Sequence, residues 1–257
     1  MLTKAKSRVA FRAIVGLGSD SSGERLITLL RRLNIAGLHV TLAGMFDVNK
    51  TGRNSQTQLQ QAYDAAASHF AGLTTLLAKK SLIETIVEED KQASIDLVVL
   101  EKPSLAEIQE LIINSNCSLL LHTNSRLETP KGRMNIVVAY DRSPHGLKVM
   151  QKFIDFAPQG VNRVDFISVL TQMLPSAERD FWLGVEIELA NVWSHCTFTE
   201  IRGDINFELV DKVNESRPDL VVIGSQGENF AGINALGKTA KHILKNSDAS
   251  ILIIKAS

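Results

Sequence analysis

Short apolar runs alternate with longer amphipathic segments along the whole chain. The apolar runs are rich in Leu, Ile and Val and alternate little with polar residues, which is typical of strands covered on both faces. We expect strands over residues 9–17, 38–46, 82–88, 95–100, 118–122, 134–140, 163–170, 196–201, 218–224 and 250–255. The segments between them predict helices over 21–34, 56–79, 104–115, 143–156, 176–193, 205–216 and 237–246. This alternation indicates a parallel sheet with right-handed crossovers.

The pattern occurs twice along the chain. The run Asp-Leu-Val-Val recurs with a displacement of 123 residues, from Asp96 to Asp219, and the first strands match at the same displacement. The second strands, 40–45 and 164–169, match with a slip of one residue. The last strands match at a displacement of 132, from Ser118 to Ser250, so nine extra residues enter the second half after Gly224. An internal repeat of this kind indicates two copies of one folding unit.

We therefore expect an α/β protein of two tandem doubly wound (Rossmann-like) domains. Each would be a five-stranded, mostly parallel sheet with helices on both faces. A chain of 257 residues is long enough for two cores. The polar segment 126–133, which contains Pro130 and Gly132, is the expected linker between domains 1–125 and 134–257.

Composition excludes several classes of function. The net charge is +0 and no basic block occurs, so we expect no nucleic-acid partner. No apolar run approaches the roughly 20 residues of a membrane helix, and no secretory signal is visible, so we expect no membrane partner. Two cysteines and six scattered histidines indicate neither a disulfide framework nor a metal site, and a cytoplasmic location is expected. His145 and His242 lie in or near the loops considered below for the second half, and a surface role is favoured for both.

Ligands of open α/β sheets bind beyond the carboxyl ends of the strands, so the loops that follow the first and fourth strands are the candidates. In the second half, Asp141 follows the first strand, and Ser143 and Pro144 precede the helix. Two interpretations remain open. Asp141 and Ser143 cap the helix, with Pro144 at its first position, or Asp141 accepts a hydrogen bond from a ligand.

The fourth strand of the second half leads into a glycine-rich segment. Gly224, Gly227, Gly232 and Gly237 allow close approach of a ligand to the backbone. Lys238 and Thr239 open the last helix, where free N–H groups and the helix dipole favour an anion. The alternative is a glycine-rich surface loop with an ordinary helix start.

The run from Gly232 to Thr239 also satisfies the P-loop pattern G-x-x-x-x-G-K-[ST]. A true P-loop begins directly at the end of its strand, whereas residues 225–231 intervene here. Only one helix and one strand follow Thr239, so no later strand supplies a magnesium-binding Asp. We therefore do not expect a P-loop NTPase.

Three features of the second half occur together: Asp141 with Ser143, the run Asp-Leu-Val-Val-Ile-Gly, and Gly224, Gly227 and Gly237 in the spacing G-x-x-G-x9-G. With these features, the sequence resembles the universal stress protein family over nearly the whole chain, as two copies. The resemblance implies that the strand-one Asp contacts adenine, a strand-two Val backs it, and the glycines hold ribose and phosphates. The ligand would be ATP, ADP or AMP, with Mg²⁺. The implied site comprises Ala139, Tyr140, Asp141, Val169, Ile223, Gly224, Gln226, Gly227, Gly237, Lys238 and Thr239.

The sequence departs from the family pattern in two places. Lys238 occupies the position of the family's Ser or Thr, which affects the contact with the terminal phosphate. In the first half, Gly18 replaces the Asp, Met45 replaces the Val, and residues 101–104 replace the glycine loop. We therefore expect no nucleotide in the first half.

The resemblance also implies that the last strands of the two halves, 118–121 and 250–254, pair within the chain. A further homodimer remains possible.

Two functions follow from these features. The first is an adenine-nucleotide-binding stress-response or regulatory module with its site in the second half. The alternative is a protein-interaction scaffold that binds no nucleotide. An enzyme, at most a slow ATPase, is disfavoured because no general base or metal-ligand cluster is visible.

Overall fold

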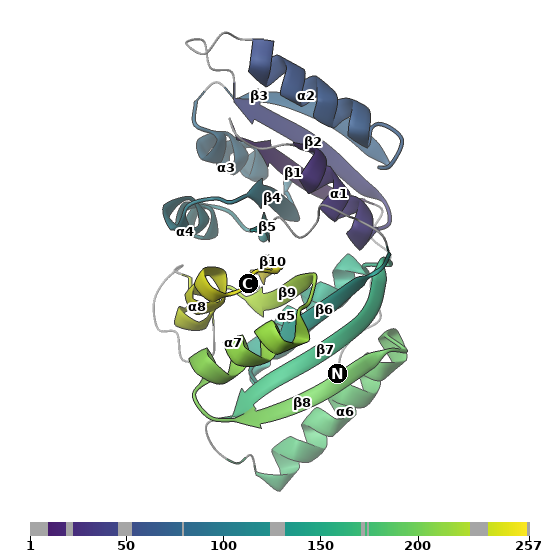
Figure 1. The fold of residues 1–257 in the computed structure, drawn as a ribbon, viewed down its shortest axis with the longest axis vertical. Helices are drawn as coiled ribbons and strands as arrows, with labels where there is room; N and C mark the ends of the chain where they lie inside the picture. The colour runs from purple at the N-terminus through teal and green to yellow at the C-terminus, as the bar shows by residue number, and fades with distance from the viewer. Residues whose placement is uncertain are drawn as a thin grey trace.

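The computed structural model describes residues 10–18, 23–45, 53–78, 80–123, 132–170, 173, 175–226 and 236–255. In that part of the chain, the strands form one ten-stranded sheet with helices on both faces (Figure 1), which confirms the expected fold class. Residues 126–131 of the expected linker and Gly227 of the expected site lie outside the described residues.

The two halves contain the same succession of elements. The first half comprises β1 (Phe11–Leu17), α1 (Gly23–Leu33), β2 (Leu38–Met45), α2 (Arg53–Ala66), β3 (Gly72–Ala78), α3 (Leu82–Ala93), β4 (Leu97–Glu101), α4 (Leu105–Asn114) and β5 (Ser118–His122). The second half comprises β6 (Met134–Ala139), α5 (Pro144–Phe156), β7 (Val161–Leu170), α6 (Ser176–Val192), β8 (Cys196–Arg202), α7 (Ile205–Ser216), β9 (Leu220–Gly224), α8 (Lys238–Asn246) and β10 (Ser250–Ile254).

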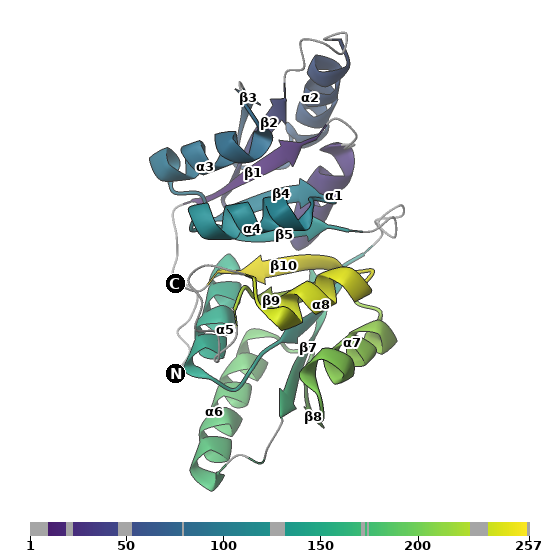
Figure 2. The same ribbon diagram turned by 90° about the vertical axis from the view of Figure 1, so that its left-hand side faces the viewer.

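The strand order is β3-β2-β1-β4-β5-β10-β9-β6-β7-β8. Pairing is parallel within each half, and the halves join where β5 and β10 pair antiparallel, with Leu120 opposite Leu252. We call this antiparallel junction the seam; Figure 2 shows the two strands side by side at mid-height. The last strands of the two halves thus pair within the chain, as expected from the sequence.

The strand registers reproduce the repeat. Ala13 pairs with Leu97 in the first half, and Ile136 pairs with Leu220 in the second. Leu97 then pairs with Ser118, as Leu220 pairs with Ser250. Since the register is kept on both sides of the nine extra residues, those residues lengthen the connection between β9 and α8 and leave the sheet unchanged.

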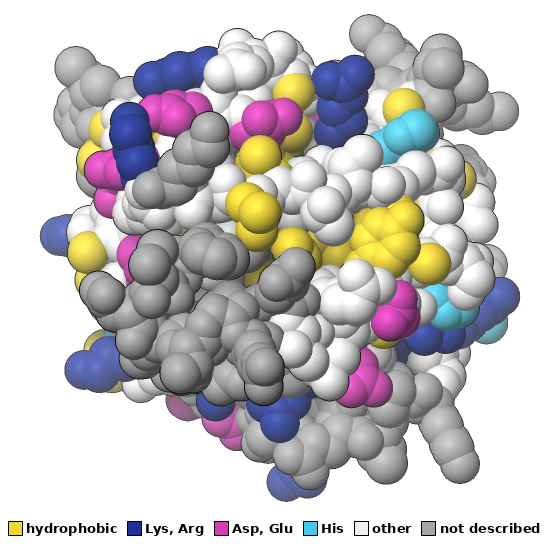
Figure 3. All heavy atoms as spheres, turned by 90° about the horizontal axis from the view of Figure 1, so that it is seen from above, with side chains coloured by type: hydrophobic (Ala, Val, Ile, Leu, Met, Phe, Trp, Pro, Cys, Tyr) yellow, Lys and Arg dark blue, Asp and Glu magenta, His cyan; other side chains and the backbone are white. Residues whose placement is uncertain are grey.

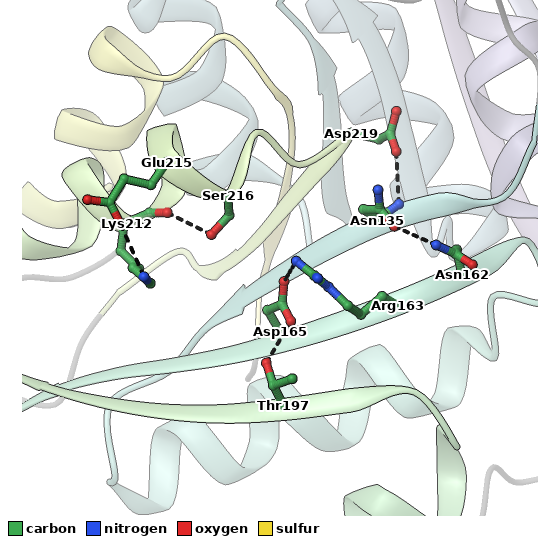
Figure 4. Close-up of polar contacts among 9 residues, drawn as sticks. All are labelled: Asn135, Asn162, Arg163, Asp165, Thr197, Lys212, Glu215, Ser216 and Asp219. Atoms are coloured by element: carbon green, nitrogen blue, oxygen red, sulfur yellow. Dashed lines mark hydrogen bonds and ion pairs between the residues drawn. The ribbon is translucent and has the colours of Figure 1, made fainter.

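The aspartate of the repeated Asp-Leu-Val-Val run has a structural role in both halves. Asp219 Oδ2 accepts a hydrogen bond from the backbone N–H of Asn135 at 2.8 Å (Figure 4). Asp96 Oδ2 accepts the equivalent bond from the N–H of Arg12 at 3.1 Å. Each aspartate therefore satisfies the backbone donor of the second residue of the neighbouring strand.

One strand of the first half was predicted wrongly. Residues 82–88, expected as a strand, begin helix α3, whose cap is Ser81: its hydroxyl accepts from the N–H of Glu84 at 3.1 Å. The buried residues Ile83, Ile86 and Val87 recur at helical spacing. The β-branched run resembles a strand, but the Ser81 cap and the burial of one face stabilise a helix.

The neighbouring helix was predicted too long. The expected helix 56–79 ends at Ala66 in the structure, and its last part forms β3. β3 pairs only with β2 and lies at the end of the sheet, so most of its residues are partly or fully exposed. Its exposed Thr74 and Thr75 therefore break the apolar run that marks the central strands.

Each face of the sheet carries its own apolar core. The first is formed with α1, α2, α5 and α6, and the second with α3, α4, α7 and α8. Trp182 is 3% exposed, and Trp193 stacks on Phe153 with ring centroids 5.2 Å apart. Both tryptophans therefore pack in or against the first core.

Polar contacts hold the halves together on either side of the seam. Lys255, just after β10, donates from Nζ to the carbonyl oxygens of Ile112 at 2.6 Å and Ser115 at 2.5 Å, at the end of α4. Thr123, just after β5, donates to the carbonyl oxygen of Ala249 at 2.6 Å. Each half thus caps backbone acceptors of the other.

The two outer strands differ in charge. β8 carries Glu200 and Arg202, whereas β3 has no charged residue. Figure 3 looks onto the β3 end, where hydrophobic side chains lie among polar ones; Leu77 of β3 is 52% exposed there. In the described ranges, no helix is long and apolar enough to cross a bilayer.

Candidate nucleotide site

Three adjacent strands of the second half bring most of the predicted residues to one edge of the sheet. β6 lies between β9 and β7, and the strand order reverses at β6. Asp141 follows β6, Gly224 ends β9, and Val169 lies near the end of β7. Because Ala139 pairs with Ile167, the end of β6 lies beside the last residues of β7. This edge is where doubly wound folds bind ligands.

Asp141 and Ser143 form a bonded pair at the start of α5. Ser143 is the N-cap: its hydroxyl oxygen accepts from the N–H of Gly146 at 3.0 Å, and Pro144 follows it. The same hydroxyl donates to Asp141 Oδ1 at 2.6 Å. The capping interpretation is therefore confirmed for Ser143, while Asp141 is oriented by the cap and does not itself form it.

Gly146 leaves the space that the Asp141 carboxylate needs. A Cβ at position 146 would collide with the Asp141 carbonyl oxygen and would lie 2.6 Å from Asp141 Oδ1. The first turn of α5 therefore packs directly against the residue predicted to contact adenine.

The apolar members of the predicted site point to opposite faces. Ala139, Val169 and Ile223 are buried in the core beneath α7 and α8. Tyr140 instead packs in the other core, where its ring centroid is 5.7 Å from that of Trp182. Burial raises the pKa of Tyr140 to about 12. Only the backbone of Tyr140 is therefore placed to face a ligand on the α8 side.

Arg142 organises a polar network that sequence reasoning missed. Its guanidinium lies 3.2 Å from Glu186 of α6 and 3.1 Å from Glu200 of β8, and its side chain is 9% exposed. Burial raises the pKa of Glu186, an effect that the charge of Arg142 opposes. The network ties the loop after β6 to α6 and β8.

The connection after β9 is anchored at both ends. The N–H of Ser225 donates to the carbonyl oxygen of Ile254 at 2.9 Å, and the N–H of Gly237 donates to the carbonyl oxygen of Ser225 at 2.8 Å. Gln226 is half-buried, and residues 227–235 lie outside the described part of the chain. The start of α8 is therefore held close to the end of β9.

Helix α8 begins after a glycine. Gly237 is its N-cap residue, and no side-chain cap hydrogen bond is found there among the described residues. Lys238 is exposed and Thr239 half-buried at the first helical positions. Backbone N–H groups in a first turn lack helical acceptors and, with the helix dipole, favour an anion.

His145 is less exposed than the sequence suggested. It lies in the first turn of α5, and its Nε2 atom is buried without a hydrogen-bond partner in the described structure. A Cβ at Gly224 would lie 3.7 Å from that nitrogen. His145 therefore faces the end of β9, across the candidate site from α8.

The equivalent strand end of the first half is filled by its own side chains. Glu101, at the position of Gly224, is almost buried and lies 3.2 Å from Arg25 of α1. Beside it on β5, His122 is fully buried, and its Nδ1 is 3.2 Å from Ser250 Oγ. The connection to α4 is only residues 102–104, and Ser104 forms a capping box with Glu107.

Among the residues that the structure describes, no group of three or more His, Cys, Asp or Glu side chains is placed to hold a metal ion.

The fold and the edge just described define a doubly wound α/β protein with a candidate anion site at a helix start. The universal stress protein family model matches residues 132–255. The second half of the chain, residues 132–255, is therefore similar to that family. No curated protein matches the sequence.

Solved structures resemble the chain over nearly its full length. A universal stress protein from Archaeoglobus fulgidus is 12% identical, with 97% of this chain and 99% of that chain covered and a TM-score of 0.68. A protein of unknown function from Pseudomonas aeruginosa is 16% identical, with 96% and 93% covered and a TM-score of 0.69. The cytoplasmic domain of a prokaryotic cation chloride cotransporter is 12% identical, with 96% of each chain covered and a TM-score of 0.64. These likenesses show the shared fold.

Proposed function

We propose that the second half binds an adenine nucleotide and that the protein is a nucleotide-binding stress-response or regulatory module. The observation that carries this proposal is the placement of Asp141, Gly224 and the start of α8 at one sheet edge. This edge lies within the residues that match the universal stress protein family model.

In this proposal, the ligand lies across the ends of three strands. Asp141 accepts a hydrogen bond from the adenine, which packs near Val169 of β7. The backbone at Gly224 faces the ribose, and the N–H groups at the start of α8 bind the phosphates. Lys238 adds a positive charge where the family places a hydroxyl, and ATP, ADP or AMP, with Mg²⁺ for the longer phosphate chains, is the ligand class.

The first half has no nucleotide role in this proposal. The Glu101 carboxylate with Arg25 occupies the strand end that Gly224 keeps free of a side chain. The Glu101 carboxylate would also repel a phosphate, and the connection over residues 102–104 has no glycine. We propose residues 1–125 and 134–257 as the two domains, with one site per chain.

The test is calorimetric titration of the purified protein with ATP-Mg, ADP and AMP, together with chromatography of any nucleotide released on denaturation. One site per chain is expected. Asp141→Asn should weaken binding, whereas the matched variant Glu101→Gln in the first half should not. The absence of both released nucleotide and measurable binding would contradict the proposal.

Lys238 is tested separately with Lys238→Ala. If the ammonium group contacts phosphate, affinity for ATP should fall more than affinity for AMP, and the difference should shrink at high salt. Equal ATP affinity in the variant and the wild type would show that Lys238 does not touch phosphate.

A scaffold function is the second candidate, and the outer surface of α6 favours it. Leu183 and Ile187 lie one helical turn apart and are 57% and 58% exposed. Exposed apolar side chains on one helix face are typical of protein contacts. A protein that fails the nucleotide test would act through surfaces of this kind.

Location and assembly complete the proposal. Cys117 and Cys196 are free thiols, which fits a reducing cytoplasm. A homodimer would join through the uncharged β3 edge, since edges without charge pair readily. Light scattering would detect it, and Thr75→Lys on that exposed edge should convert a dimer into monomers.

A further inference from the structure

A buried nitrogen faces the glycine that ends β9. His145 Nε2 is buried and has no hydrogen-bond partner among the residues that the structure describes. A Cβ at Gly224 would lie 3.7 Å from Nε2 and 3.1 Å from Val149 Cγ2. Burying a polar atom without a partner is unfavourable, so such an atom at a ligand-binding edge indicates a missing partner.

The place of His145 along the site follows from the strand order. Val169 on β7 and Asp141 after β6 lie at one end, and the start of α8 lies at the other. Gly224, at the end of β9, is between them, and the N–H of Gly237 donates to the carbonyl oxygen of Ser225 at 2.8 Å. A group that faces Gly224 therefore meets the middle of a ligand that spans the edge.

We propose that His145 is a specificity-determining residue that recognises the phosphate attached to the ribose. This inference rests on the proposed nucleotide site. With adenine at Asp141 and the outer phosphates at α8, the ribose and its phosphate lie opposite Gly224. Nε2–H of the imidazole donates to a phosphate oxygen, and a bond to a charged acceptor is stronger than one to a ribose hydroxyl.

The proposal makes His145 discriminate between nucleotide and nucleoside. Adenosine offers no phosphate to Nε2, so it leaves the buried nitrogen without a partner, whereas AMP, ADP and ATP all supply one. A site that leaves a buried polar group unpaired rejects the ligand that lacks its partner. The protein should therefore bind AMP more tightly than adenosine.

The experiment is calorimetric titration of four full-length proteins with AMP and with adenosine: wild type, His145→Ala, His145→Gln and His195→Ala. AMP is the probe because it carries only the phosphate in question. His145→Ala should weaken AMP binding by about tenfold or more and leave adenosine binding unchanged. His145→Gln should retain most AMP affinity, because its amide nitrogen takes the place of Nε2 as donor. His195 is exposed and directly precedes β8, at the amino ends of the strands and away from the candidate site. His195→Ala should therefore bind both ligands like wild type.

Three results would overturn the inference. Equal AMP affinity in wild type and His145→Ala would remove His145 from the phosphate contact and leave the nucleotide site intact. An equal loss for AMP and adenosine in a variant with an unchanged melting temperature would assign His145 to the nucleoside instead. Failure of the wild type to bind AMP, ADP or ATP would refute the nucleotide site itself and His145's role with it.

Discussion

Ser143 Oγ donates a hydrogen bond of 2.6 Å to Asp141 Oδ1 while accepting one from the N–H of Gly146. One hydroxyl thus begins helix α5 and orients the carboxylate of the candidate site. Stability and ligand binding should therefore respond to the same substitution.

Ser143→Ala should lower the free energy of unfolding by about 1 kcal/mol, because it removes an N-cap. It should also weaken nucleotide binding, since Asp141 loses the hydrogen bond from the Ser143 hydroxyl. Ser104→Ala is the matched control: it removes the cap of α4 in the first half, outside the candidate site. Chemical denaturation and calorimetry measure the two effects, and equal nucleotide affinity in both variants would contradict the role of Ser143.

Gly146→Ala should disrupt the loop after β6, because the added methyl group would collide with the Asp141 carbonyl oxygen. We expect a loss of about 1–3 kcal/mol in the free energy of unfolding and weaker nucleotide binding. Gly184→Ala is the control: nothing lies within 4 Å of a Cβ at that exposed position of α6. There the substitution should stabilise the helix by about 0.5–1 kcal/mol. If the Gly146→Ala protein were as stable as wild type and bound nucleotide equally well, the loop would accommodate the methyl group without cost.

Acid should weaken the fold through His122. Burial lowers the pKa of His122 below its ordinary 6.5, although the charge of Glu101 opposes the shift; Arg25 and Lys102 lower it further. The folded state thus binds this proton less readily than the unfolded chain does. The contribution of His122 is complete above pH 6.5 and is lost as the pH falls from there toward the folded-state pKa.

The measurement is the free energy of unfolding between about pH 8 and pH 5, the range in which histidine titrates. His122→Asn, which keeps an acceptor or donor toward Ser250, should show a smaller loss on acidification than wild type. His195→Asn, at an exposed position, should behave like wild type. Identical pH profiles for all three proteins would remove His122 from the acid response.

Lys255→Met should weaken the contact between the halves. Lys255 Nζ donates two hydrogen bonds to carbonyl oxygens at the end of α4, and a charged donor near a helix C-terminus is favourable. We expect a loss of about 1–3 kcal/mol in the free energy of unfolding by urea titration. Lys245→Met, at an exposed position of α8, is the control. Equal midpoints for the two variants would mean that Lys255 adds nothing across the seam.

Much of the second half could be predicted because its helices carry local start signals. Ser143 with Pro144 marks α5, and Asp204 caps α7 through the N–H of Asn206 at 2.8 Å. In the first half, Ser81 likewise precedes a helix, but the β-branched run that follows it resembles a strand. A local cap was therefore better evidence than residue type.

Contacts between distant segments could not be predicted in the same way. Arg142 meets Glu186 across 44 residues of sequence, and no spacing rule connects them. The approach of His145 Nε2 to Gly224 likewise depends on how α5 packs against β9, which only the folded sheet brings about. Sequence identifies the strand ends at which such residues gather; their partners emerge from tertiary packing.

The seam between β5 and β10 also affects how the protein can change over generations. In a pair of identical chains, any substitution appears on both sides of the symmetry axis at once. Here the two sides are encoded separately, so Glu101 fills one strand end while Gly224 occupies the other. In a single polypeptide, the two halves can therefore keep the paired sheet while their sequences and functions diverge.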